Sequence, residues 1–368
     1  MENIDVLIDR FPEIEYILED IRDSGSDYYI KGECFYLKLD QLDEYVKIHF
    51  SQLEELCNLD LAENIPYLSY LGTYGIKYKN YYEICTSITN PRFFLGDSNQ
   101  WNTKPLQLKI DQTQFEISPI SKLLVLLTET LYSDNNIGHV NFKDFASIKM
   151  IINDKKDYQE QYCKALYYLN SGYLRKKGYV ASLFDLHINY DEGIEEEEII
   201  NNRVKILNRK DFISIEPLNL YNEAVIENGF QKFLYLYRVL EFFMTRAILT
   251  HLKEVRYDEK ISEDEILNNL NIRDEQKQLI NLLEKALTSA QKQRITIYAL
   301  KQNLIKKNSF NDVCVELYKF RNSNVHAKEK EINSTCFPNP FHPDTVCSKW
   351  IEIVEIIAKR CIKKYNSL

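Results

Sequence analysis

The sequence lacks several features that would place it in a common class of protein. None of its eight cysteines forms a C-x2-C pair, so we expect reduced thiols and no zinc site or disulfide framework. No apolar run is long enough to span a membrane, and the start is too acidic for a signal peptide, so we expect a cytoplasmic protein. Only 10 glycines and 9 prolines occur among 368 residues, which favours an ordered globular chain over a disordered one.

An excess of positive charge is also missing, because the formal net charge is −9. A protein that bound nucleic acid over its whole surface would normally be basic, so broad non-specific binding is not expected, although a local basic site remains open. The chain contains no P-loop, G-x-G-x-x-G, H-E-x-x-H or G-x-S-x-G. These absences remove the usual signatures of nucleotide binding, zinc proteolysis and serine hydrolysis. We therefore expect no metal and no cofactor.

The length of the chain, 368 residues, exceeds that of a typical single core and predicts two domains. We expect an α+β protein in which residues 1–210 form a mixed α/β domain and residues 211–368 form an all-α helical bundle. An acidic run at 191–198 is the best candidate for the boundary region.

In the first domain, the spacing of apolar residues predicts both helices and strands. Helices are expected over 1–24, 40–57, 120–132 and 155–173, hairpins over 28–39 and 106–117, and further strands over 66–90. The 26 tyrosines of the chain suit amphipathic interfaces or stacking surfaces, but an AT-rich genome explains them equally well. No catalytic motif stands out in this domain.

A compact basic patch, Arg175, Lys176 and Lys177, follows the helix expected over 155–173. Its simplest interpretation is structural, because cations near a helix C-terminus complement the helix dipole. Contact with RNA is the alternative interpretation. We retain these three residues as candidate substrate contacts.

In the second domain, helical spacing recurs with few strand signals. Helices are expected over 222–253, 261–271, 274–290, 296–306, 309–321 and 344–365, with Ser309 as the N-cap of the fifth. The last helix should bury one face, made of Val346, Trp350, Ile353, Val354, Ile357 and Cys361. Glu241 falls within the apolar stripe of the first helix, so its carboxylate needs a partner. Arg321 is the obvious partner, either for catalysis or as a purely structural ion pair.

Arg321 begins the motif R-x4-H, which ends at His326 and has Asn322 directly after the arginine. A second match, Arg246 and His251, lies inside a strongly helical run. There, residues five positions apart point roughly 140° away from each other, so we discount this match. In the first match, the intervening Asn and Ser residues favour caps and turns over helix interiors. We therefore expect the chain to break after Arg321, so that Arg321 and His326 converge.

The motif FRNSNVHAK, with the segment 217–244 about one hundred residues before it, resembles the HEPN superfamily of ribonucleases, and specifically ApeA-like HEPN domains. The resemblance covers about 155 residues at the C-terminus. It implies a homodimer in which the motifs of two protomers face each other across a composite cleft. It also implies that Arg321 and His326 are the catalytic pair, that Asn322 supports them, and that Glu241 orients Arg321.

What the resemblance implies chemically is cleavage of RNA without a metal ion. His326 would take the proton from the 2′-hydroxyl or protonate the leaving 5′-oxygen, and Arg321 would stabilise the charged phosphate. Lys328 would contact the substrate. Because Lys328 occupies the position where nucleotidyltransferase-controlled HEPN toxins carry a tyrosine, control by modification of that tyrosine is not expected.

By association, the resemblance also suggests a biological role. Proteins with such a C-terminal domain are often toxins or abortive-infection effectors of anti-phage defence, with a phage trigger or an antitoxin protein as partner. The competing hypothesis is a non-catalytic HEPN-type module that binds RNA or protein.

Overall fold

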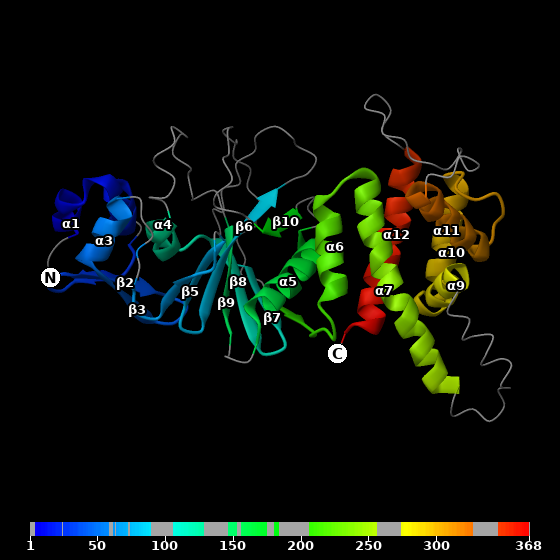
Figure 1. Ribbon diagram of the computed structural model, residues 1–368, viewed down its shortest axis with the longest axis horizontal. Helices are drawn as coiled ribbons and strands as arrows, with labels where there is room; N and C mark the ends of the chain where they lie inside the picture. Colours follow the sequence, from blue (N-terminus) through cyan, green and yellow to red (C-terminus); the bar gives the residue numbers. More distant parts are fainter. Residues whose placement is uncertain are drawn as a thin grey trace. The chain divides into compact units, whose positions relative to one another are not determined.

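The computed structural model places the chain in two compact units, Met1–Arg209 and Lys210–Leu368 (Figure 1). The residues that it describes are 4–23, 25–58, 62, 64–72, 74–89, 106–128, 146–152, 156–174, 180–183, 206–255, 274–326 and 345–367. The first unit is rich in strands and the second is helical, so a mixed α/β chain with C-terminal helices is confirmed. Within the described ranges, no helix is long and apolar enough to cross a membrane.

The first unit opens with short helices and a small antiparallel sheet. Its elements are α1 (Asp5–Arg10), the 3-10 helix η1 (Pro12–Ile14), α2 (Glu15–Asp23), β1 (Tyr28–Ile30), β2 (Cys34–Leu39), β3 (Glu44–His49) and α3 (Phe50–Cys57). The strands pair in the order β1-β2-β3. The helical start and the hairpin over 28–39 are therefore confirmed.

The helix expected over 40–57 is wrong in its first half, because β3 occupies 44–49. Along β3, Val46 and Ile48 are buried whereas Tyr45 and Lys47 are exposed. This alternation has the period of a strand with one buried face. Only from Phe50 does the chain become helical, with the His49 side chain and Gln52 closing a capping box.

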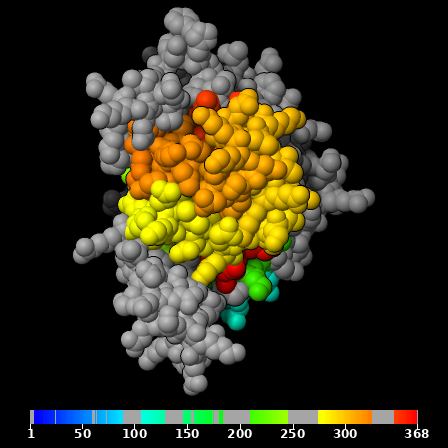
Figure 2. Space-filling model, turned by 90° about the vertical axis from the view of Figure 1, so that its right-hand side faces the viewer, coloured from blue at the N-terminus to red at the C-terminus, as the bar shows by residue number. Residues whose placement is uncertain are grey.

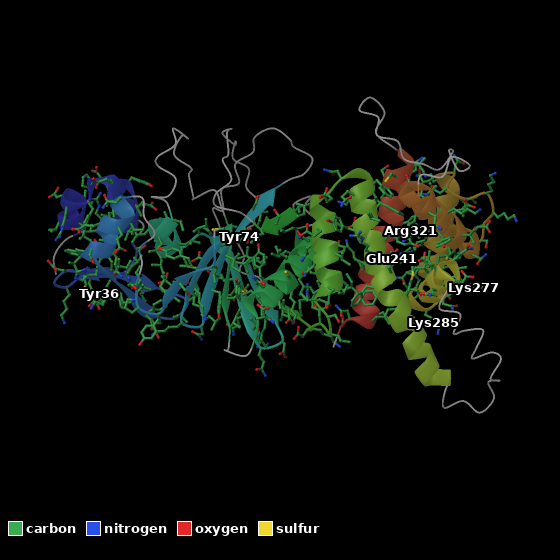
Figure 3. The ribbon with its side chains drawn as sticks, in the orientation of Figure 1. Tyr36, Tyr74, Glu241, Lys277, Lys285 and Arg321 are labelled. Atoms are coloured by element: carbon green, nitrogen blue, oxygen red, sulfur yellow. The ribbon has the colours of Figure 1, made fainter. Side chains whose placement is uncertain are left out.

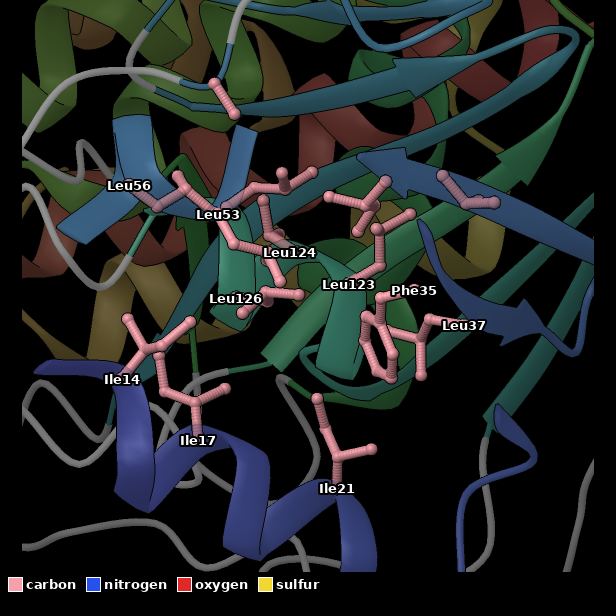
Figure 4. Packing of buried hydrophobic residues seen from close by; sticks show 14 of the residues in the cluster. Ile14, Ile17, Ile21, Phe35, Leu37, Leu53, Leu56, Leu123, Leu124 and Leu126 are labelled. Carbon is pink, nitrogen blue, oxygen red and sulfur yellow. The ribbon is translucent and has the colours of Figure 1, made fainter. Parts of the chain in front are cut away.

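A continuous hydrophobic cluster joins these elements to the helix α4 (Lys122–Thr128). Ile14, Ile17 and Ile21 from the first helices face Leu123 and Leu126 of α4 (Figure 4). Phe35 and Leu37 of β2 close the cluster from the sheet side. The inner face of the small sheet is therefore committed to the core, and its outer face is left without a layer from this cluster.

A larger, mostly antiparallel sheet follows. Its strands are β4 (Leu68–Tyr70), β5 (Gly75–Tyr78), β6 (Tyr81–Thr89), β7 (Leu106–Ile110), β8 (Thr113–Pro119), β9 (Ala146–Ile151), β10 (Val180–Leu183) and β11 (Ile206–Arg209). Within the described part of the chain, the order is β11-β7-β8-β9-β6-β5-β4, with β10 beside β6 and only β11 parallel to its neighbour. The hairpin over 106–117 and the strands over 66–90 are confirmed.

One face of the large sheet packs against α5 (Tyr158–Tyr168), which continues as the π-helix η4 (Leu169–Tyr173). Phe115, Ile148 and Met150 share a buried cluster with Tyr162 and Ala165 of this helix. The helix expected over 155–173 is therefore present. The basic patch Arg175–Lys177 and the acidic run 191–198 lie outside the described residues.

The second unit consists of α6 (Glu216–Ile226), α7 (Gly229–Val255), α9 (Glu275–Ala286), α10 (Ser289–Lys301), α11 (Phe310–His326) and α12 (Thr345–Tyr365). The helix expected over 222–253 is two helices, separated where Gly229 adopts φ 54°. The helix expected over 274–290 is α9. The helix expected over 296–306 is wrong in its bounds, because α10 begins at Ser289 and ends at Lys301. The range 261–271 is not described.

The last helix, α12, packs along α7 and buries the face expected from its sequence. Trp350, Ile353, Val354, Ile357 and Cys361 are all buried, but Val346 is exposed, contrary to expectation. The end of this unit is tied to its beginning, because the Asn366 side chain accepts a hydrogen bond from Ser214 N at 2.8 Å and donates one to Ser214 O at 2.7 Å.

Candidate functional site

The guanidinium of Arg321 on α11 meets side chains from two other helices. Its Nη2 donates to Oε1 of Glu241 on α7 at 2.7 Å, and its Nη1 lies 3.6 Å from Oε2 of Glu275 on α9. Nη1 also donates to Oδ1 of the neighbouring Asn322 at 2.9 Å. The expected pairing of Glu241 with Arg321, 80 residues apart, is therefore confirmed as a contact (Figure 3).

The backbone that carries Arg321 is held by the residue before it. Phe320 is buried, with its ring edge-on to Phe233 of α7 at 5.0 Å between centroids and tilted against Trp350 of α12 at 6.0 Å. Aromatic contacts of this kind add to the free energy of area burial. Phe320 thus fixes the position along α11 from which Arg321 reaches out.

Tyr237, one helical turn before Glu241 on α7, forms the inner wall of the site. Its ring lies 5.5 Å from the Arg321 guanidinium carbon, within the range of a cation–π contact. Burial raises the pKa of the Tyr237 phenol, and this outweighs the opposing effect of Arg321. The phenol is therefore neutral at physiological pH, and its ring contributes a polarisable surface rather than a charge.

The exposure of the charged groups increases outward from Arg321. The side chain of Arg321 is 16% exposed, that of Glu241 36% and that of Glu275 57%. The Arg321 Nε is buried without a hydrogen-bond partner. The guanidinium is thus the least exposed of the three charged groups, with its carboxylate partners nearer to the solvent. Figure 2 shows one face of the second unit, where α9, α10 and α11 lie next to one another.

The expected chain break after Arg321 does not occur, because α11 continues to His326. The polar residues that were expected to break it are satisfied within the helix. Ser323 Oγ donates to the Phe320 carbonyl at 3.0 Å, and Asn324 Nδ2 donates to the same carbonyl at 2.7 Å. Such back-bonding lets Ser and Asn remain inside a helix.

A continuous helix changes the geometry of the motif. Residues five positions apart on one helix point roughly 140° away from each other, which is the argument that discounted Arg246 and His251. Positions 321 and 326 of one chain therefore lie roughly 140° apart around the axis of α11. The His326 side chain itself is outside the described residues, as are Lys328 and Arg175–Lys177.

Sequence reasoning missed two residues of the site, Glu275 and Tyr237. Tyr237 had a signal, since it lies on the same helical stripe as Glu241 at a spacing of four. Glu275 had none, because its place in the first turn of α9, after the capping residue Asp274, does not reveal which helix α9 faces. In the described part of the chain, no three or more His, Cys, Asp or Glu side chains are grouped so that they could hold a metal ion.

Comparison with known proteins adds no assignment. No protein family, curated protein or solved structure matches the chain.

Proposed function

We propose that the chain is a metal-independent endoribonuclease of the HEPN type, with Arg321 binding the phosphate that is cleaved. The observation that carries the proposal is the ion pair between Arg321 and Glu241, with Asn322 as a further partner of the guanidinium. These contacts connect the two stretches of sequence on which the HEPN resemblance rests.

The partners of Arg321 differ in how firmly they hold it. The contacts with Glu241 and Asn322 have hydrogen-bond lengths, whereas Glu275 lies at 3.6 Å and is the most exposed of the three charged groups. An RNA phosphate would therefore displace Glu275 first, at small cost, because that carboxylate can return to water. Glu241 and Asn322 would keep the guanidinium oriented, so that its planar fork can bind phosphate oxygens.

The continuous helix α11 bears on how histidine enters the reaction. Since positions 321 and 326 of one chain lie roughly 140° apart around the continuous helix α11, we infer that the arginine of one copy acts with the histidine of another in a homodimer. His326 would exchange the proton with the 2′-hydroxyl or the 5′-oxygen, and Arg321 would stabilise the charge on the phosphate. The products would be a 2′,3′-cyclic phosphate and a 5′-hydroxyl.

The proposed biological setting is a cytoplasmic toxin or abortive-infection effector of anti-phage defence. In this setting, the first unit would recognise the RNA or a trigger. Activity would stay latent until a phage component or the loss of an antitoxin protein releases it.

The test is to induce the wild type, Arg321→Ala and His326→Ala in cells, to follow growth and total RNA, and to treat RNA with each purified protein in EDTA. The second R-x4-H match supplies a matched control, Arg246→Ala and His251→Ala. We expect fragments with cyclic phosphate ends from the wild type and the control variants, unaffected by EDTA, and none from the Arg321 and His326 variants. Equal RNA patterns from all five proteins, with a candidate trigger present, would refute the proposal.

One observation favours a second function, a non-catalytic module that binds RNA or protein. The Arg321 guanidinium is mostly buried and already has three oxygen-bearing partners, which is also how a structural arginine would be held. In that case Arg321→Ala would lower the melting temperature, and neither variant would change any RNA pattern.

A further inference from the structure

The small sheet of the first unit has an outer face that is aromatic. Side chains alternate along β1, β2 and β3, so Phe35, Leu37 and Val46 point into the core, whereas Tyr29, Tyr36 and Tyr45 point away from it. The partner register places Tyr29 directly opposite Tyr36. Figure 3 labels Tyr36 on this sheet. The outer face therefore carries a cluster of three tyrosines from three strands, which we call the tyrosine platform.

The rings of the tyrosine platform contact one another. Tyr29 and Tyr36 stack with 4.3 Å between ring centroids and 9° between ring planes. Tyr45 meets Tyr29 edge-on at 5.0 Å and is 39% exposed. No described residue hydrogen-bonds to any of the three hydroxyls. The platform is thus pre-ordered by its own packing, so a planar ligand that stacks on it would meet rings with little rotational freedom left to lose.

Lysines surround the platform, and they differ in their partners. Lys38 lies 3.1 Å from both Asp27 and Asp43 and is neutralised. Lys47, exposed beside Tyr45 on β3, and Lys31, exposed between β1 and β2, have no ion-pair partner among the residues described. Two free ammonium groups next to three tyrosines match a chain that alternates bases and phosphates.

We propose that the tyrosine platform binds single-stranded RNA, with bases stacked on Tyr29, Tyr36 and Tyr45 and phosphates near Lys31 and Lys47. Aromatic rings on the exposed face of a small sheet can stack unpaired bases, whereas a duplex keeps its bases stacked inside and offers only its backbone. That the ligand is RNA rests on the proposed function. The platform would give the first unit a role in holding the substrate.

The number of free lysines sets the salt dependence of this binding. With two free lysines, at most about two phosphates are neutralised, so the slope of log K against log salt concentration should be about −1.4. Most of the affinity must then come from stacking. A protein partner docking on the same tyrosines would not show a preference for unpaired bases.

The test measures RNA binding separately from cleavage, on the full chain carrying His326→Ala. Fluorescence anisotropy with a labelled single-stranded oligoribonucleotide is compared for that protein and for versions that add Tyr36→Ala, Tyr36→Phe or Lys47→Glu. Tyr16→Ala, an exposed tyrosine of α2, is the control. We expect Tyr36→Ala to weaken binding about tenfold, which is about 1.4 kcal/mol, and Tyr36→Phe and Tyr16→Ala to change it less than twofold.

A second measurement locates the contact without relying on a substitution. RNA containing photoactivatable 4-thiouridine is cross-linked to the same full chain, and the modified peptides are identified by mass spectrometry. Cross-links at Tyr36 or Tyr45, outcompeted by single-stranded but not double-stranded RNA, support the proposal. Cross-links confined to other segments, equal competition by duplex, or unchanged affinity in Tyr36→Ala would overturn it. Binding that follows this pattern without any cleavage by the wild type, with a candidate trigger present, would leave the platform supported and refute the nuclease.

Discussion

Each unit contains a carboxylate that pairs with a side chain from another element, and the two differ in almost every other respect. In the first unit, Glu83 of β6 is fully buried and accepts hydrogen bonds from Tyr81 Oη, Ser147 Oγ and both the N–H and Oγ of Ser121. All of these donors are neutral. In the second unit, Glu241 is partly exposed and pairs with the cation Arg321.

The difference between the two clusters indicates which of them suits the proposed RNA cleavage. The donors around Glu83 come from β6, β9 and the start of α4, and they close around the carboxylate with no solvent-facing side. A closed, satisfied network of this kind fixes strand and helix positions. The cluster around Arg321 has an exposed side where Glu275 lies, and its cation is not saturated, since Nε has no partner. The first cluster is thus structural, whereas the second has a solvent-exposed side, as the proposed function requires.

The largest expected effect comes from removing the carboxylate at the centre of the closed cluster, Glu83. Glu83→Ala leaves one amide and three hydroxyls without their acceptor and creates a cavity, so we expect a loss of about 3–5 kcal/mol in the stability of the first unit. Hydrogen exchange of the amides in β6 and β9 measures this loss. Glu54→Ala, which removes an exposed ion pair with Arg10, should cost less than about 1 kcal/mol. Similar protection in both variants would contradict the assignment of Glu83 as a structural residue.

The next effect concerns activity at the open cluster. Arg321→Lys keeps the charge opposite Glu241 but removes the planar fork, so we expect RNA cleavage to fall about 100-fold. The melting temperature should change little, because Glu241 remains partly solvated and can pair with the ammonium. Cleavage rates and thermal unfolding of the same preparations measure the two effects. Loss of folding with unchanged specific activity would instead make Arg321 a structural residue like Glu83.

Sequence reasoning recovered local elements well and failed where partners from distant segments decide. The alternation of apolar and polar residues in 106–117 was enough to predict a hairpin. The two strands are adjacent in the sequence, and Asp111 adopts φ 51° at the turn between them. The pairing of Glu241 with Arg321 was also recoverable, since a carboxylate in an apolar stripe demands a cation.

Two main expectations about secondary structure were wrong, and each error has a physical cause. The apolar residues in 40–57 fit both a helical period and a strand alternation. Residues 44–49 form a strand because they pair with β2. The end of α11 was placed too early because Ser323 and Asn324 have poor helix propensity, but both side chains bond back to the Phe320 carbonyl. Neither the strand partner nor the back-bonding is visible in composition or spacing.

The smallest expected effect tests whether Glu275 competes with an RNA phosphate for Arg321. This carboxylate faces Arg321 at 3.6 Å but is mostly solvated, so Glu275→Gln should remove repulsion of an RNA phosphate without unbalancing the fold. We expect RNA to bind about two- to fivefold more tightly, with a difference that shrinks as salt screens the charge. Anisotropy at two salt concentrations measures this effect, and Glu284→Gln, an exposed glutamate farther along α9, is the control. Weaker binding in Glu275→Gln would mean that this carboxylate orients Arg321 instead of competing for it. The site would then resemble the closed cluster of Glu83 more than its exposure suggests.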